Sequence, residues 1–153
     1  MAEDTLAELL PRLARLSSLL GRGELFDRAV AATELRLERP AMTVLVNLHM
    51  SGGPLRIGQI ATLMHVAGPH VTRHVQGLER RGLTERVVDQ EDQRARLITL
   101  TAEGRLITGR YLHVVRRWFA DAMAGWTAQD QRDLTRLVDR LVSDLTTRLD
   151  ADL

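Results

Sequence analysis

Side chains suited to contacts with nucleic acid, most of them polar, are concentrated in one short segment, residues 69–76. They are Pro69, His70, Thr72, Arg73, His74 and Gln76. The planar guanidinium fork of Arg73 matches guanine edges and phosphate oxygens, and the other side chains can contact bases or phosphates. Val71, Val75 and Leu78 recur at spacings of four and three, so they share the opposite face of one helix. The segment therefore predicts a helix with one packed face and one face free to enter a DNA groove.

A second polar run, residues 89–94, separates two short apolar or β-branched stretches, residues 83–88 and 96–100. This pattern predicts a β-hairpin with a polar tip. Arg94 at the tip is suited to a minor groove, where narrow A·T-rich tracts concentrate negative potential. Asp92, two positions earlier, is predicted to hold the Arg94 guanidinium by a charge-assisted pair.

Helices must position both polar segments. Pro40 suits the first turn of a helix that runs to His49 or Met50, and a short helix is predicted from Ile57 to Met64. After a tight connection, a second helix is predicted from Pro69 to Arg81, closed by Gly82 in a conformation with positive φ. Two short helices and a following hairpin define a winged helix-turn-helix, whose second helix reads the DNA.

The rest of the chain is predicted to be helical. An amphipathic pattern from Leu6 to about Leu37 is interrupted at Gly21 and Gly23, where a kink or break is expected. Thr101 is predicted to cap a helix that ends near Gly125. Thr127 and Asp130 resemble a capping box before the last helix.

The first and last helices carry more leucine than one small winged domain needs for its own core, which indicates a homodimer. Trp118 and Trp126 are expected to pack in the dimer core. We predict a mainly α (α+β) fold, with a winged helix-turn-helix over residues 40–101. Residues 1–39 and 102–153 are predicted to form a helical dimerisation region in the same intertwined domain.

Composition narrows the function classes. The chain has 153 residues, 44% of them hydrophobic, with no apolar stretch long enough for a membrane span or secretory signal. Cysteine is absent, which excludes a disulfide framework and a thiolate metal site. The net charge is only +1, but all 21 basic residues are arginine, a bias that genomic base composition alone can also produce. We expect a cytoplasmic protein with no cofactor and no membrane partner.

Four stretches together resemble the MarR family of winged helix-turn-helix transcriptional regulators. They are Val71-Thr72-Arg73, Leu78-Glu79-Arg80-Arg81-Gly82-Leu83, Asp89 to Arg94, and Leu100-Thr101-Ala102-Glu103-Gly104. The resemblance implies a homodimer that binds a pseudo-palindromic operator, with recognition helices in successive major grooves about 10 base pairs apart and wings in flanking minor grooves. It also implies a small aromatic or acidic effector at the junction of the dimerisation and DNA-binding parts, and repression as the commoner mode.

Two positions depart from the family pattern. Glu91 replaces the first arginine of the usual Asp-x-Arg-Asp-x-Arg wing, leaving Arg94 as the arginine of that motif. Since glutamate repels phosphate, the wing is expected to make fewer contacts and the salt dependence of binding to be shallower. Gly68 and Pro69 stand where serine is common, which leaves the operator sequence open.

Arg15 and His113 are the effector-binding candidates, because an acidic ligand needs a cation or donor near the junction of the first and fifth helices. An interhelical salt bridge or a solvated arginine is an equally good interpretation. His70 and His74, four residues apart, could hold a metal, although zinc requires more ligands than these. A metal-responsive regulator of the same fold, and a winged-helix interaction dimer without DNA binding, remain as alternatives. No segment organises a base and nucleophile for catalysis, so no enzyme is expected.

Overall fold

The computed structural model describes residues 2–151, with side chains described for residues 5–149 and 151. The elements in chain order are α1 (Ala2–Gly21), α2 (Glu24–Ala31), α3 (Arg39–Met50), α4 (Ile57–Met64), α5 (Gly68–Arg80), β1 (Thr84–Val88), β2 (Arg96–Leu100), α6 (Ala102–Ala122) and α7 (Ala128–Ala151). Within residues 2–151, no helix has the combination of length and apolar content that crossing a bilayer requires. The chain divides into two compact units, residues 1–116 and 117–153, and each is described by itself.

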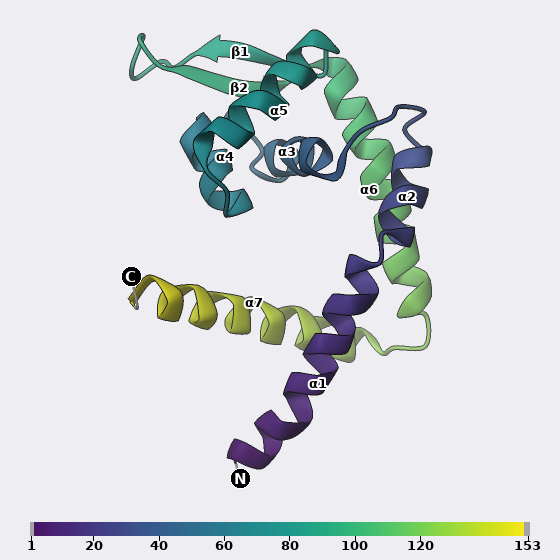
Figure 1. Cartoon of the computed structure of the whole chain (residues 1–153). Helices are drawn as coiled ribbons and strands as arrows, with labels where there is room; N and C mark the ends of the chain where they lie inside the picture. The colour runs from purple at the N-terminus through teal and green to yellow at the C-terminus, as the bar shows by residue number, and fades with distance from the viewer. Residues whose placement is uncertain (1, 152–153) are drawn as a thin grey trace. The chain divides into compact units, whose positions relative to one another are not determined.

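The core of the first unit lies among α3, α4, α5 and the hairpin (Figure 1). Its fully buried side chains come from every one of these elements. They include Val44 and Leu45 of α3, Ile60 of α4, Val71 and Val75 of α5, and Ile98 of β2. Because each helix contributes one apolar stripe to this core, its other face remains in solvent. The mainly α winged fold predicted from the sequence is confirmed.

The hairpin pairs β1 with β2 in antiparallel register, from Thr84 opposite Leu100 to Val88 opposite Arg96. Leu55, in the connection between α3 and α4, adds a short third pairing. The Leu55 and Ile98 backbones exchange two N–H to carbonyl bonds of 3.0 and 2.8 Å. The wing is therefore joined to the helix-turn-helix by backbone pairing as well as by buried side chains.

The start of α6 packs very closely against the entrance to β1. Thr101 donates its hydroxyl to the Gly82 carbonyl at 2.6 Å and accepts the Gly104 N–H at 3.0 Å, which confirms it as the cap of this helix. The backbone N–H of Thr101 also donates to the Leu83 carbonyl at 3.1 Å. Gly82 has the predicted positive φ of 69°. Glycine at position 104 allows α6 to lie directly on the Leu83 carbonyl.

The prediction of a helical pattern reaching Leu37 was wrong over its last residues. The break at the glycines is confirmed, since α1 ends at Gly21 and Gly23 has a φ of 86°. However, α2 ends at Ala31, because the buried Thr33 diverts the chain. Its hydroxyl donates to the Val30 carbonyl at 2.7 Å and accepts the Leu35 N–H at 3.2 Å. This local side-chain bonding replaces the next helical turn.

The second unit consists of the end of α6 and α7. The predicted capping box is present: the Thr127 N–H and hydroxyl both donate to Asp130, and the Asp130 N–H donates to the Thr127 hydroxyl oxygen. Within residues 117–149, every apolar side chain larger than alanine is at least partly exposed. One face of α7 carries Leu134, Leu137, Val138, Leu141, Val142, Leu145 and Leu149, each between 36% and 65% exposed. The unit thus has no core of its own within these residues.

Candidate nucleic-acid interface

Helix α5 has the two-faced character that the sequence predicts. Val71, Val75 and Leu78 are at most 1% exposed and fix the helix on the core. Pro69, His70, Arg73 and Gln76 are exposed, and Thr72 and His74 are half-buried. The Thr72 hydroxyl donates to the Gly68 carbonyl at 3.2 Å, so its proton is used within the helix. It remains able to accept a hydrogen bond from a ligand.

The turn between α4 and α5 is tight because His65 adopts a left-handed conformation with a φ of 53°. The Val66 N–H then returns to the Ala61 carbonyl at 3.1 Å. Pro69 lies in the first turn of α5, as predicted, and Ala67 caps the helix without a side-chain bond. Pro69 has no N–H, and the His70 N–H donates to the Ala67 carbonyl at 3.1 Å. The first turn of α5 therefore depends on its side chains, rather than on free backbone amides, for the predicted DNA contacts.

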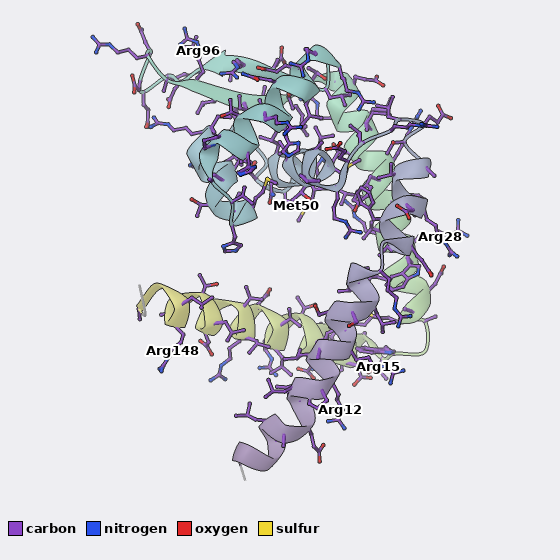
Figure 2. The ribbon with its side chains drawn as sticks, viewed as in Figure 1. Arg12, Arg15, Arg28, Met50, Arg96 and Arg148 are labelled. Atoms are coloured by element: carbon purple, nitrogen blue, oxygen red, sulfur yellow. The ribbon has the colours of Figure 1, made fainter. Side chains whose placement is uncertain are left out.

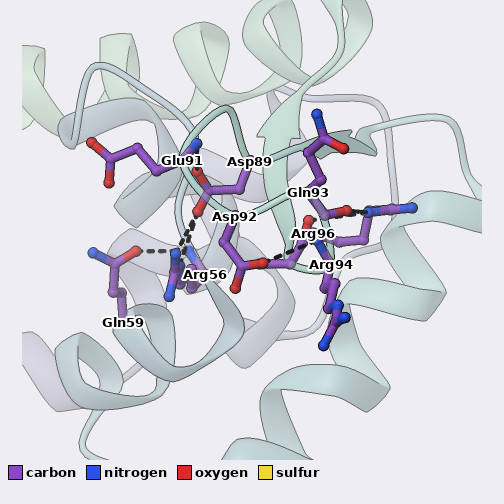
Figure 3. Close-up of polar contacts among 9 residues, drawn as sticks. Arg56, Gln59, Asp89, Glu91, Asp92, Gln93, Arg94 and Arg96 are labelled. Atoms are coloured by element: carbon purple, nitrogen blue, oxygen red, sulfur yellow. Dashed lines mark hydrogen bonds and ion pairs between the residues drawn. The ribbon is translucent and has the colours of Figure 1, made fainter.

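At the tip of the wing, the predicted pairing of Asp92 with the Arg94 guanidinium was wrong (Figure 3). The Asp92 carboxylate instead accepts the backbone N–H of Arg94 at 3.0 Å, which makes Asp92 a turn-forming residue. The Arg94 side chain is exposed and makes no ion pair with any described residue. Arg94 is thus free to reach a ligand, whereas Asp92 shapes the turn.

Arg56 holds the base of the wing, and sequence reasoning missed it (Figure 3). This residue precedes α4, and its guanidinium donates to Asp89 Oδ2 through Nη2 at 2.5 Å and Nε at 3.2 Å. The other carboxylate oxygen of Asp89 accepts the Glu91 N–H at 2.9 Å. Asp89 is only 7% exposed. It therefore links the helix-turn-helix to the start of the hairpin tip.

Two other arginines also belong to the wing. Arg86 of β1 pairs with Glu79 of α5 at 2.7 Å, which ties the strand to the recognition helix. Arg96 of β2 donates to the carbonyls of Gln93 and Ala95 at 2.8 and 3.2 Å, and it is exposed on the hairpin (Figure 2). The wing therefore has a second exposed arginine near its tip. Arg96 lies outside the family motif and was not predicted from the sequence.

Hydrogen bonding to Arg56 holds the pKa of Asp89 below its ordinary value of 3.8, with a further contribution from the Glu91 N–H. Because the pKa is depressed in the folded state, the ionised carboxylate stabilises the wing fully above pH 3.8. That contribution is lost as the pH falls through the lower, folded-state pKa. We expect the Asp89 carboxyl to titrate below 3.8 in a carbon-detected NMR titration of the folded protein.

Asp89→Asn should loosen the wing at neutral pH, because it removes the charge that Arg56 holds while keeping the shape of the side chain. Trypsin cleaves after arginine, so native-state proteolysis after Arg94 and Arg96 should be faster in this variant. Glu91→Gln is the matched control, since it removes an exposed carboxylate of the same turn and leaves its backbone N–H in place. Equal cleavage rates in wild type and Asp89→Asn would show that the ion pair does not order the wing.

The effector candidates lie in different places. His113 of α6 lines an open pocket of about 610 Å³ together with Arg105, Leu106 and Arg110 of the same helix and Glu34 of the α2–α3 connection. Arg110 pairs with Glu34 at 3.7 Å. Arg15 is an exposed residue of α1 and does not line this pocket (Figure 2). The cations beside His113 are therefore Arg105 and Arg110, which follow the Leu100–Gly104 motif and were not singled out from the sequence.

Metal ligands are not grouped. Within the described residues, no cluster of three or more histidine, aspartate or glutamate side chains is arranged to hold a metal ion. His70 is exposed and His74 half-buried on α5. These residues therefore provide no metal site that would support the alternative of a metal-responsive regulator.

Comparisons with known proteins agree with this geometry. Residues 37–95 match the model of the MarR family. A MarR family protein from Bacillus stearothermophilus is 24% identical, with 95% of this chain and 99% of that chain covered and a TM-score of 0.74. A probable transcriptional regulator from Pseudomonas aeruginosa is 26% identical, covers 89% of this chain and 98% of its own, and has a TM-score of 0.63. A mutant of S. aureus MepR bound to an oligodeoxyribonucleotide is 21% identical, with coverages of 87% and 97% and a TM-score of 0.58. No curated protein matches the chain.

The fold and the exposed face of α5 define a winged helix-turn-helix protein that is similar in fold to a MarR family protein. The predicted resemblance to the MarR family is confirmed, and the match to the family model extends over residues 37–95. That segment contains the helix-turn-helix, Arg56, Asp89 and the tip of the wing.

Proposed function

We propose that this protein is a cytoplasmic transcriptional regulator that binds a pseudo-palindromic operator as a homodimer and is released by a small aromatic or acidic effector. The observation that carries the proposal is the exposed polar face of α5, held on the core by Val71, Val75 and Leu78. The wing supports it with the exposed Arg94 and Arg96. The MepR structure with an oligodeoxyribonucleotide adds support, because its fold is similar.

The roles of the α5 side chains follow from their exposure. Pro69 and His70 are proposed to meet base edges or a thymine methyl at the start of the helix, and Arg73 and Gln76 to read further into the groove. Thr72 and His74, which are half-buried, suit the phosphates at the groove edge. Arg94 is proposed to enter the flanking minor groove, where Asp92 fixes the turn that carries it.

Footprinting on the DNA upstream of the protein's own gene tests this proposal. We expect a protected pseudo-palindrome with half-sites about 10 base pairs apart. Arg73→Ala should weaken binding by about 1–3 kcal/mol per subunit and relax specificity at one position of each half-site. Arg94→Ala should weaken binding at the flanks of the operator.

Arg28→Ala is the matched control for both arginine variants, because Arg28 is exposed on α2 and lies outside α5 and the wing. It should bind as the wild type does. An absence of any protected site at low salt, with a folded protein, would contradict the proposed function. Loss of the dimer in Arg73→Ala or Arg94→Ala would contradict the roles assigned to these residues.

The effector is proposed to bind in the pocket beside His113. Its walls combine apolar side chains such as Leu106 and Val114 with the cations Arg105 and Arg110, a combination that suits an aromatic carboxylate. Binding at this place would shift the spacing of the two recognition helices, because α6 follows the wing directly.

A thermal-shift series with benzoate and related aromatic carboxylates tests the effector site. A ligand specific to the folded state should raise the melting temperature in proportion to its concentration. His113→Ala and Arg110→Ala should abolish the rise. Arg15→Ala decides whether the α1 residue participates, since it should keep the rise if the pocket alone binds the ligand. Equal shifts in the wild type and His113→Ala would exclude this pocket.

A further inference from the structure

A second pocket, of about 270 Å³, lies on the flank of the recognition helix. One wall is the connection from α2 to α3 with the amino end of α3, and the other is α5. Four arginines line it: Arg36 from the connection, Arg73 and Arg80 from α5, and Arg81 directly after α5. Arg73 also belongs to the face proposed to read DNA, so the pocket adjoins that face.

The charges in this pocket are unbalanced. Glu38 is the only carboxylate in its lining, against the four guanidinium groups. None of these arginines pairs with a carboxylate among the side chains that the structure describes. Arg81 donates Nη1 to the Arg36 carbonyl at 2.6 Å, which holds the two walls together without neutralising either charge. Guanidinium groups that line one small pocket repel one another, and an anion bound among them would offset that repulsion.

Gly77 lines the same pocket in the middle of α5. Glycine costs a helix interior roughly 1 kcal/mol relative to alanine, so its presence calls for a reason. Neither steric crowding nor the backbone conformation requires glycine at this position. A Cβ at this position would meet only Arg80 Nη2, at an ordinary 3.8 Å, and the φ of Gly77 is not positive. What the missing side chain does provide is open space between the arginines.

We propose that this pocket binds a phosphate group. Arginine forks match phosphate oxygens in geometry and charge, and several forks around a small cavity favour a group with more than one negative charge. The α3 terminus adds to this, because Ala41 lines the pocket in the first turn of a helix whose N-cap, Glu38, makes no side-chain cap. The phosphate comes either from the DNA backbone or from a free phosphorylated small molecule. In the second case the molecule competes with DNA for Arg73.

Titration with pyrophosphate at constant ionic strength, followed by calorimetry, tests the free-anion source. The informative variant is Arg36→Gln/Arg80→Gln, because neither side chain makes a hydrogen bond or ion pair with another described residue. We expect saturable binding to the wild type and a Kd raised about tenfold or more in this variant. Arg22→Gln/Arg28→Gln is the control, since it removes the same charge from exposed positions outside the pocket and should leave the Kd unchanged.

Duplex binding over a range of salt concentrations tests the DNA source, and only this arm rests on the proposed function. Each arginine–phosphate interaction that the variant removes should reduce the slope of log K against log salt by about 0.9. A reduced slope in Arg36→Gln/Arg80→Gln, with no pyrophosphate binding to the wild type, assigns the site to the DNA backbone. Saturable pyrophosphate binding that displaces the duplex assigns it to a free ligand.

Gly77→Gln provides a second variant that leaves every charge in place. Its neutral side chain would occupy the open space and should remove whichever binding the wild type shows, while circular dichroism confirms a folded helix. The proposal is overturned if the wild type binds no pyrophosphate and the arginine variant keeps the wild-type salt slope. It is also overturned if the Arg22→Gln/Arg28→Gln control loses as much binding. A wild type that binds pyrophosphate but no duplex contradicts the proposed function and leaves the phosphate site standing.

Discussion

Gly104→Ala is expected to destabilise the protein by about 3 kcal/mol, at the upper end of the usual cost of overpacking. A Cβ at this position would lie 1.9 Å from the Leu83 carbonyl oxygen and 2.9 Å from its carbon, and both are backbone atoms. They cannot turn aside, because the same carbonyl accepts the Thr101 N–H. The start of α6 would have to move away from the wing. Urea denaturation at one fixed protein concentration measures the loss as a lower midpoint.

Gly109→Ala is the matched control in the same helix. Nothing lies within 4 Å of a Cβ at position 109, so alanine should gain the helix propensity that glycine lacks, roughly 1 kcal/mol. The two alanine substitutions are therefore expected to shift the midpoint in opposite directions. A Gly104→Ala variant as stable as the wild type would show that α6 and the Leu83 carbonyl do not need this close contact.

Leu141→Asp/Leu145→Asp should abolish the proposed dimer and, with it, most of the operator affinity. Both leucines lie on the exposed apolar face of α7, which finds no core within its own unit. Two charges on a face buried between subunits would cost several kcal/mol because they lose their hydration. Since a dimer gains about 10²–10⁴ in affinity from binding both half-sites together, the monomer should lose a factor in that range. Light scattering and operator titration measure the two effects.

Ser143→Asp/Thr147→Asp is the control for this prediction. It adds the same charge to the same helix on the face away from the leucines, where both residues are exposed. The control should remain dimeric and bind the operator with the wild-type affinity. If the leucine variant stayed dimeric at low micromolar concentration, the apolar face of α7 would not be the subunit interface.

The winged helix-turn-helix could be predicted from the sequence because its boundaries are set by local chemistry. The helices at 39–50 and 57–64 begin and end within a residue or so of the prediction, where Pro40 starts one helix and glycines follow it. The hairpin and the two caps at Thr101 and Thr127 follow from equally local patterns. Each of these signals acts within a few residues, so one sequence is enough to reveal it.

The interactions that organise the candidate site could not be predicted in this way. Arg56 and Asp89 are 33 residues apart, and Arg81 and Arg36 are 45 apart, so only the folded chain shows that they meet. The error at Asp92 has a different cause. A carboxylate two residues before an arginine has two donors within reach, the backbone N–H and the guanidinium, and the turn geometry favours the N–H.

The pairing of Leu55 with Ile98 makes the base of the wing stiffer than its tip. At its base, Ile98 is fully buried and bonded to a backbone segment distant in the sequence, so its amide hydrogen should exchange only when the whole winged unit opens. Beyond Asp89, the turn is held by bonds within the tip itself. In the proposed DNA complex, a wing anchored at its base and free at its tip would bend at the tip to follow minor grooves of different width, while α5 keeps its place.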